Sequence, residues 1–424
     1  MDFSYRVLPD KTIQIYYYSV NGDRITIPKR VHFKKVTNLD CNFAWHSVKK
    51  VPLYFNGDIK QWCELSAINP DLNYNISELH IDGKLIVNEL VIPEGVTSIN
   101  DRVFSRNNQI TSLKISDTVT SIGICAFYAC KSLKSIVIGK NVTKIGSSAF
   151  AYCENLETVI FEEGSKLDEI GEAAFLECKK LKSIIIPDGV KKISRLTFDI
   201  CTSLRKVVLP ANLNYMEDFV FCNCRELKEI EFPKYLYGIG DFCFNSSGLE
   251  KITWNNYLRK IGVNCFLGTN LTEMKLPSSV ISIGLDAFSF KTKSLNIPKG
   301  VKKLSSLTGF EGELEKIVFE YGCKIKYFNK NAFLGLRNIK TIITGDEVTR
   351  CMAKAFIEYG LDSDTFTKAT RASASGISLR TGFKSKSRKR HLFPAFSISF
   401  MTCFRMTDLP HRRIPVIILM RSLS

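Results

Sequence analysis

The feature that most constrains this chain is a phrase that it repeats. The segment "IGICAFYACKSLKSIVIGKNVTKIGSSAFAYC" (122–153) contains the pattern I-G-x-x-A-F-x-x-C twice, 23 residues apart. We use the phenylalanine of this pattern, the repeat phenylalanine, as a marker. Eleven markers follow one another at steps of 22, 23 or 25 residues: Phe104, Phe127, Phe150, Phe175, Phe198, Phe221, Phe244, Phe266, Phe288, Phe310 and Phe333. A fixed period of this length is typical of a solenoid, in which each repeat forms one coil.

Each repeat follows the outline L-x-x-I-x-I-P-x-x-V-x-x-I-G-x-x-A-F-x-x-C, as in "LKSIIIPDGVKKISRLTFDIC" (181–201). The alternation in L-x-x-I-x-I predicts a strand, and the proline ends it because proline cannot donate to a ladder. The A-F pair is expected to point inward at a corner. The glycine before it is expected to permit a turn at a backbone angle that other residues resist. These glycines are Gly123, Gly146, Gly171, Gly240, Gly262 and Gly284.

One coil alone has an apolar face and nothing to bury it against, whereas stacked coils bury ladders of Leu, Ile, Val and Phe. The sequence therefore predicts a β-rich solenoid, a right-handed leucine-rich-repeat coil of about 10–11 repeats of 22–25 residues with capped ends. We expect residues 1–89 to form an N-terminal cap or degenerate repeats, with a short helix near 58–65 that turns Trp62 into the first coil. Residues 90–345 are expected to form the array.

The chain after the array changes character. Residues 346–363 predict a capping helix, with one more degenerate coil as the alternative. Residues 364–424 carry twelve Lys or Arg and two Asp, so they hold most of the net charge of +17 and are expected to be disordered. Their basic run, 384–391, predicts a localisation signal or weak contacts with anionic partners. The alternatives are a solvated tail or translation past a frameshift.

The 14 cysteines do not have the spacing of a zinc site, because C-x-x-C is absent from the sequence. A structural role at the corners, where a small and easily buried side chain is needed, is the favoured interpretation, and redox or metal roles stay open. Free thiols would favour a reducing compartment. The members that recur three residues after a repeat phenylalanine are Cys130, Cys153, Cys178, Cys201 and Cys224.

Motifs of catalysis and nucleotide binding are missing from the sequence, which contains none of G-x-S-x-G, H-E-x-x-H, a Walker loop or G-x-G-x-x-G after a strand. We therefore predict that the protein is not an enzyme and uses no cofactor. The first residues lack the apolar stretch of a secretory signal, and no run of about 18–20 apolar residues predicts a transmembrane segment. On these grounds alone a cytoplasmic location is favoured.

The repeat outline resembles the leucine-rich repeat of BspA-like proteins, also called the treponemal type, over about residues 90–345. Residues 56–101 resemble the module that leads into such arrays in many bacterial members. The resemblance implies adhesion or protein binding at a cell surface or after secretion. The family pattern contains no catalytic residues to transfer to this chain.

The most informative positions for function lie between the two inward aliphatic residues of the main strand, because the side chain there points outward. Four consecutive coils place a β-branched aliphatic residue there, and a contiguous apolar row on a solvent-facing sheet is a candidate contact site. These residues are Val137, Ile160, Ile185 and Val208, and the neighbouring outward row is Ser135, Thr158, Ser183 and Lys206. Alternatively, β-branched residues simply suit a strand, or the N-terminal region covers them.

The sequence thus predicts a non-enzymatic binding or adhesion module that presents a repeated sheet surface to a protein or glycan. The alternative is an intracellular scaffold whose basic tail contacts anionic lipid or nucleic acid through salt-sensitive charge pairing.

Overall fold

The computed structural model divides the chain into two compact units, Met1–Ser375 and Gly376–Ser424. All described residues belong to the first unit: 3–20, 23–39, 42–45, 50–66, 76–288, 291–302, 304, 313–325, 328, 340–344 and 348. The predicted capping helix (346–363) lies outside the described residues, apart from the buried Val348. The predicted basic tail (364–424) and its run 384–391 lie outside them too.

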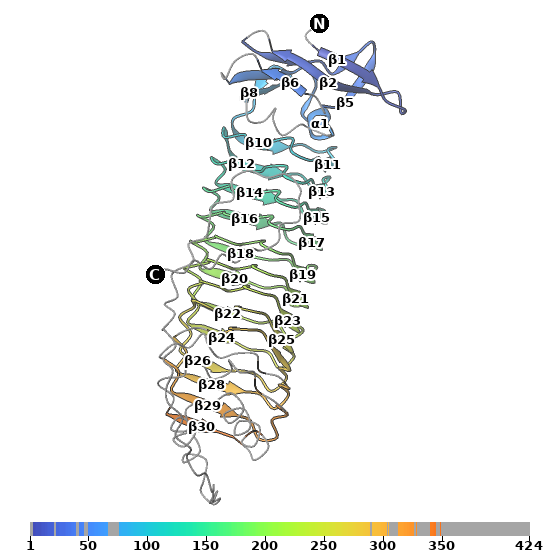
Figure 1. The fold of residues 1–424 in the computed structure, drawn as a ribbon. Coiled ribbons are helices and arrows are strands. Elements are labelled where there is room, and N and C mark those ends of the chain that lie inside the picture. The colour runs from blue at the N-terminus through green and yellow to red at the C-terminus, as the bar shows by residue number, and fades with distance from the viewer. Residues whose placement is uncertain are drawn as a thin grey trace, which may run out of the picture. The chain divides into compact units, whose positions relative to one another are not determined.

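Two small sheets and one helix precede the array (Figure 1). In the first sheet, β2 pairs with β1 antiparallel and with β5 and β6 in parallel, and β4 forms a hairpin with β5. Its strands are β1 (Phe3–Val7), β2 (Ile13–Val20), β4 (Arg30–Val31), β5 (Lys34–Asn38) and β6 (Asn42–Trp45). The second sheet holds β3 (Ile25–Ile27), β7 (Val51–Phe55), β8 (Ile76–Ile81) and β9 (Lys84–Leu85), and α1 spans Ile59–Cys63.

Each coil of the array contributes one main strand and, in most coils, one short strand, and most successive strands of each kind pair in parallel (Figure 1). The predicted β-rich solenoid is therefore confirmed. The main strands are β10 (Asn88–Ile92), β12 (Ile110–Ile115), β14 (Ser135–Ile138), β16 (Thr158–Phe161), β18 (Ser183–Ile185), β20 (Lys206–Val208), β22 (Glu229–Glu231), β24 (Lys251–Thr253), β26 (Glu273–Lys275), β28 (Ser294–Ile297), β29 (Lys316–Phe319) and β30 (Thr341–Ile343).

The short strands lie on the opposite side of each coil from the main strands (Figure 1). They are β11 (Ser98–Ile99), β13 (Ser121–Ile122), β15 (Lys144–Ile145), β17 (Glu169–Ile170), β19 (Lys192–Ile193), β21 (Tyr215–Met216), β23 (Gly238–Ile239), β25 (Lys260–Ile261) and β27 (Ser282–Ile283).

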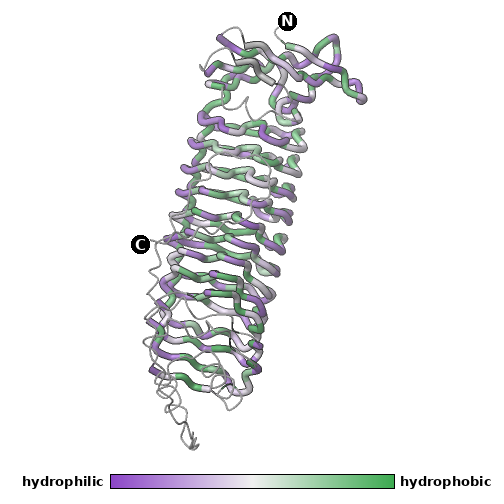
Figure 2. The backbone as a smooth tube through the Cα atoms, viewed as in Figure 1, coloured by the Kyte–Doolittle hydropathy of each residue, from purple (hydrophilic) through white to green (hydrophobic). Residues whose placement is uncertain are grey.

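The repeat phenylalanines form the predicted ladder between these strands. From Phe104 to Phe266 their ring centroids lie 5.2–5.6 Å apart in successive coils, with the rings stacked, and every one from Phe104 to Phe288 is buried. Figure 2 shows apolar positions recurring at the same place from coil to coil. Phe310 and Phe333 lie outside the described residues.

The corners around these phenylalanines are hydrogen-bonded from coil to coil. The amides of Cys125, Phe127 and Ala129 donate to the carbonyls of the next coil at 2.7–2.9 Å, and the same three-bond pattern recurs along the array. Alternate amides point the same way because the residues two before and two after the phenylalanine have positive φ, such as 54° at Cys125 and 55° at Ala129. The corners therefore form a third row of hydrogen bonds beside the row of main strands and the row of short strands.

The explanation expected for the repeated glycines is wrong. Positive φ occurs in the corner residues just described and in other glycines, but not in the six glycines that precede A-F. Instead these six are sites of close approach: a Cβ on Gly262 would lie 2.3 Å from the backbone of Gly240, and one on Gly146 would lie 2.6 Å from that of Gly123. Asn100, Ser194 and Glu217 take this position in other coils. The short strands β17 and β19 beside Ser194 are not paired, whereas β21 beside Glu217 pairs with both of its neighbours.

Replacing one of these glycines tests the close approach. Gly262→Ala should lower the free energy of unfolding by about 1–3 kcal/mol, because the backbone of the preceding coil has to move. Ser194→Ala is the matched control, since that position already holds a Cβ and should lose only about 1 kcal/mol with its hydrogen bond to the Ile170 carbonyl. Equal losses in urea denaturation would contradict the steric explanation.

The recurring cysteines bridge coils through their thiols. Cys130, Cys153, Cys178, Cys201 and Cys224 each donate from Sγ to the carbonyl of the repeat phenylalanine one coil back, at 3.1–3.3 Å. Burial raises the pKa of Cys153 to about 12, so its thiol keeps the proton that it donates. All eleven described cysteines are free thiols. Ser247 takes the equivalent place in a later coil, and its Oγ is buried without a partner among the described residues.

Sulfur forms hydrogen bonds over longer distances than oxygen does. This difference predicts the order of stability of variants at these cysteines. Cys178→Ser should lose about 1–3 kcal/mol of unfolding free energy, because a hydroxyl there would be buried and unpaired, and it should be less stable than Cys178→Ala. Thermal unfolding followed by circular dichroism measures the order. Cys125→Ser, at a half-buried position, serves as the control. A Cys178→Ser variant more stable than Cys178→Ala would contradict the role given to the thiol.

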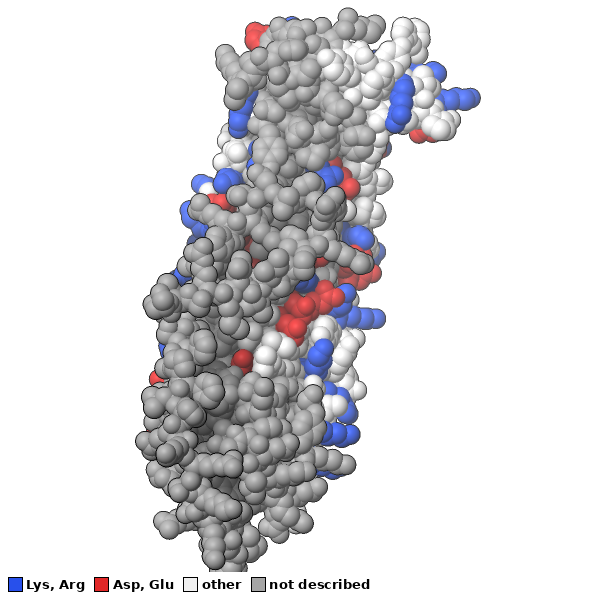
Figure 3. All heavy atoms as spheres, in the orientation of Figure 1, with Lys and Arg blue, Asp and Glu red and all other residues white. Residues whose placement is uncertain are grey.

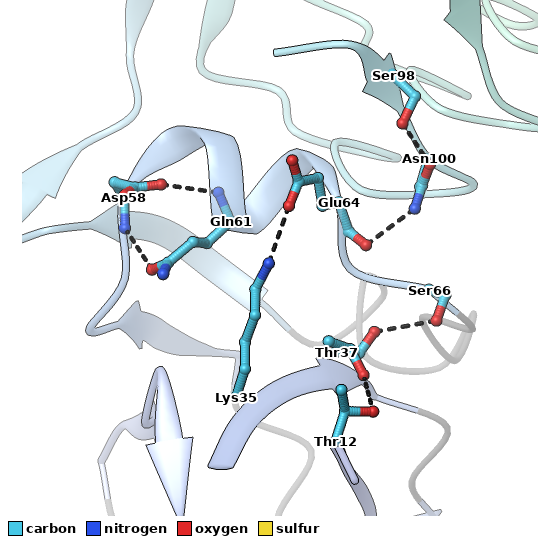
Figure 4. Close-up of polar contacts among 9 residues, drawn as sticks. All are labelled: Thr12, Lys35, Thr37, Asp58, Gln61, Glu64, Ser66, Ser98 and Asn100. Atoms are coloured by element: carbon cyan, nitrogen blue, oxygen red, sulfur yellow. Dashed lines mark hydrogen bonds and ion pairs between the residues drawn. The ribbon is translucent and has the colours of Figure 1, made fainter. Parts of the chain in front are cut away.

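Helix α1 lies next to the first coil (Figure 1), and Figure 4 shows Glu64, which follows the helix, beside Asn100 of that coil. It begins with a capping box between Asp58 and Gln61. The Trp62 indole donates to the carbonyl of Val103 at 2.9 Å, in the place where a preceding coil would supply an amide. Asn100 donates its backbone amide to Cys63 and its side-chain amide to the Glu64 carbonyl, so the end of α1 is also satisfied.

Candidate functional site

The predicted aliphatic row lies on the outer face of the main sheet. Val137 pairs with Ile160, and Ile185 pairs with Val208, so the four side chains line up across four coils. The exposed fractions are 50% for Ile160, 67% for Ile185 and 41% for Val208, whereas Val137 is only half-buried rather than fully outward. We call these four residues the aliphatic strip. It is exposed chiefly at its last three members.

The neighbouring polar row is aligned in the same register. Ser135 pairs with Thr158, Thr158 with Ser183, and Ser183 with Lys206. Outside this row, Lys182 lies 2.6 Å from Glu157, and its ammonium holds the pKa of that carboxyl below the ordinary value. Exposed ion pairs of this kind contribute little stability. They give the strip a hydrogen-bonding and charged rim.

Two hollows adjoin the strip where strand pairing fails. Strands β16 and β18 pair only at Thr158 and Ser183, and a hollow of about 510 Å³ opens beyond that pair, lined by Ile160, Ile185 and the loop at Gly164. That loop contains the two-residue insertion of the 25-residue step. Strands β20 and β22 are not paired, and a hollow of about 890 Å³ lies there, lined by Val208, Lys206 and Tyr235.

Sequence reasoning missed a cluster of two exposed tyrosines beside the second hollow. Tyr235, which lines it, and Tyr257 are 44% and 51% exposed. The rings of Tyr235 and Tyr257 lie 6.3 Å apart in successive coils, and Lys234 Nζ lies 5.0 Å from the Tyr235 ring centroid. Comparing the second residue after the main strand's proline position in successive repeats would have found Tyr235 and Tyr257. Exposed tyrosines are favoured in protein contacts because they offer a large area with few rotatable bonds.

A buried carboxyl lies at the corners, away from the sheet faces. Burial raises the pKa of Asp199 to about 6, and the nearby Glu177 adds to the effect. The Asn223 amide donates to Asp199 Oδ1 at 3.3 Å, and this hydrogen bond lowers the pKa and so opposes the effect of burial. The folded state therefore prefers the protonated acid, and this contribution to stability is lost as the pH rises from about 4 through 6.

Asp199→Asn should accordingly stabilise the protein at pH 7 by about 2–3 kcal/mol, with the gain disappearing below about pH 4. Denaturant unfolding of both proteins between pH 4 and 8 measures it. Asp168→Asn, at an exposed position, is the control. A gain that does not change with pH would show that the ionised carboxylate is not its source.

In the part of the chain that the structure describes, no group of three or more His, Cys, Asp and Glu side chains is placed to hold a metal ion. None of the helices in that part has the length and apolar character that crossing a bilayer requires.

The stacked parallel coils define a leucine-rich-repeat solenoid. The chain matches the family model described as the BspA type leucine-rich repeat region (six copies) over residues 76–205, 191–313 and 259–373. These overlapping matches span well over half of the sequence, so the chain belongs to the BspA-type leucine-rich repeat family. The resemblance noted from the repeat outline is confirmed.

Several solved structures are similar to this chain. A leucine-rich repeat protein from Bacteroides ovatus ATCC 8483 is 25% identical with a TM-score of 0.58, over 82% of this chain and 95% of that one. A leucine-rich cell surface protein from Faecalibacterium prausnitzii A2-165 is 22% identical, with a TM-score of 0.40 over 89% and 97%. The pneumococcal vaccine antigen PcpA is 18% identical, with a TM-score of 0.44 over 84% and 95%. No curated protein matches the chain.

Proposed function

We propose that the protein is a binding module that holds a protein partner on the outer face of its main sheet. The observation that carries the proposal is the aliphatic strip: three exposed β-branched side chains in register, with polar and charged rows beside them. An apolar centre within a polar rim is the usual anatomy of a protein contact. Membership in a repeat family whose coils build extended surfaces supports the same role.

The strip and the tyrosines form one continuous candidate surface. Val208, the last member of the strip, lines the same hollow as Tyr235, so a partner seated along the strip from Ile160 would reach the tyrosine cluster. Aliphatic side chains favour a protein over a glycan, because a glycan offers little apolar area to bury. The coils are joined by hydrogen bonds at their corners and, between most coils, along their strands, so little conformational entropy is lost on binding.

The alternative function, a scaffold acting through a basic tail, depends on residues 384–391. These lie outside the described residues, and that function stays a prediction.

Charge placed on the strip tests the proposal. Ile160→Lys with Ile185→Lys should weaken capture of the partner by about tenfold or more, because two apolar contacts become charges that must be desolvated. Proteins captured from cell-surface and cytosolic extracts are quantified by mass spectrometry, and circular dichroism checks folding.

The matched control is Ile124→Lys with Ile281→Lys, which changes two isoleucines of similar exposure outside the strip. A protein retained by the parent and the control but lost from the strip variant supports the proposal. The same captured proteins at the same levels from all three would contradict it.

A further inference from the structure

The hairpin of β4 and β5 presents an aromatic side chain in an unfavourable turn. Val31 pairs with Lys34, so His32 and Phe33 form a two-residue loop, with φ of 46° and 65°. Positive φ at both loop residues is the geometry that Asn-Gly adopts readily and that a bulky residue resists. Phe33 is nevertheless 92% exposed, so burial does not compensate for the strain.

Contacts around the loop hold this geometry. Arg30 Nη1 donates to the Phe33 carbonyl at 2.7 Å, and the His32 ring lies 5.9 Å from that of Tyr5. The hairpin is also tied to the sheet, because Val36 of β5 pairs with Ile13 of β2. A strained residue maintained by its surroundings and pointing into solvent is a reason to look for a function.

The charges around Phe33 are nearly all of one sign. Lys29, Arg30 and Lys34 are exposed, and Lys11 is exposed in the turn before β2, at the same end of the sheet. The acid nearby in the sequence is Asp10, whose carboxylate accepts hydrogen bonds from Thr12. Figure 3 shows Lys and Arg side chains over one end of the N-terminal sheet, with uncharged atoms between them and a smaller acidic patch beside them.

We propose that this hairpin is a peripheral contact for an anionic lipid surface. Phe33 enters the headgroup region, and Lys29, Arg30, Lys34 and Lys11 approach the acidic headgroups. One projecting ring encircled by flexible cations suits a lipid surface, where apolar insertion and charge attraction add together. A protein pocket would instead favour a wider apolar contact around the ring. The proposal does not depend on the function of the aliphatic strip.

The test uses the full chain and sedimentation with vesicles of phosphatidylcholine, alone or mixed with phosphatidylserine. We expect binding to the mixed vesicles only. Phe33→Gly should weaken it about tenfold or more, since the inserted ring is lost. The same substitution should raise the unfolding temperature, because glycine accepts positive φ without strain. Lost lipid binding with gained stability separates the proposed role from a structural one.

Two further variants test whether another exposed ring, or charge elsewhere in the chain, could explain the vesicle binding. Tyr321→Ala removes an equally exposed ring elsewhere in the chain and should leave vesicle binding unchanged. Lys29→Glu with Lys34→Glu should abolish the binding. Failure to bind phosphatidylserine vesicles would overturn the proposal. Binding that is unaffected by Phe33→Gly would overturn it too, because the attraction would then be charge alone, as a basic tail could supply.

Discussion

The hydrogen bonds between successive corners are the constraint on which the rest of the array depends. Three amides per coil donate to the next coil, and they do so only because residues on both sides of the repeat phenylalanine have positive φ. This places one phenylalanine directly over the next and brings the backbones together at the glycines. Coils of 22, 23 and 25 residues keep these bonds, so differences in repeat length are accommodated outside the corners.

The same constraint positions the candidate surface. Corners in register bring the main strands into register, so one outward position per coil becomes a continuous row. The two-residue insertion before Leu167 is accommodated in a turn, and its consequence appears on the sheet, where β16 and β18 pair at one position only. The aliphatic strip therefore crosses one place where pairing is reduced, between Ile160 and Ile185, and ends at a second after Val208, and each has a hollow beside it.

The period, the ladder of phenylalanines and the outward strip were all predictable, because periodicity alone determines which residues share a face. The role of the repeated glycines was not predictable. It depends on the distance between the backbones of neighbouring coils, which the sequence of one repeat does not reveal. The cysteines illustrate the same limit: their burial follows from the pattern, whereas the bond from Cys153 to the Phe127 carbonyl joins two coils.

The features that sequence reasoning missed fall outside the repeat outline or off its main strand. Tyr235 and Tyr257 recur at a turn position where most coils have small or polar residues. The hairpin at Phe33 has no Asn-Gly or similar signal, so the sequence "KRVHFKK" gives no sign of a tight turn. Its geometry is imposed by pairing with β2 and by the contact from Arg30.

Amide hydrogen exchange measured residue by residue tests the central claim most directly. If the corners form a ladder of their own, the amides of Phe127, Phe150 and Phe175 should exchange as slowly as those of Ile136 and Val159 in the main sheet. The loop amide of Glu163 gives the rate of an exposed turn. Corner amides that exchange at that loop rate would show that the coils are held by their sheets and packing alone, and would contradict the account.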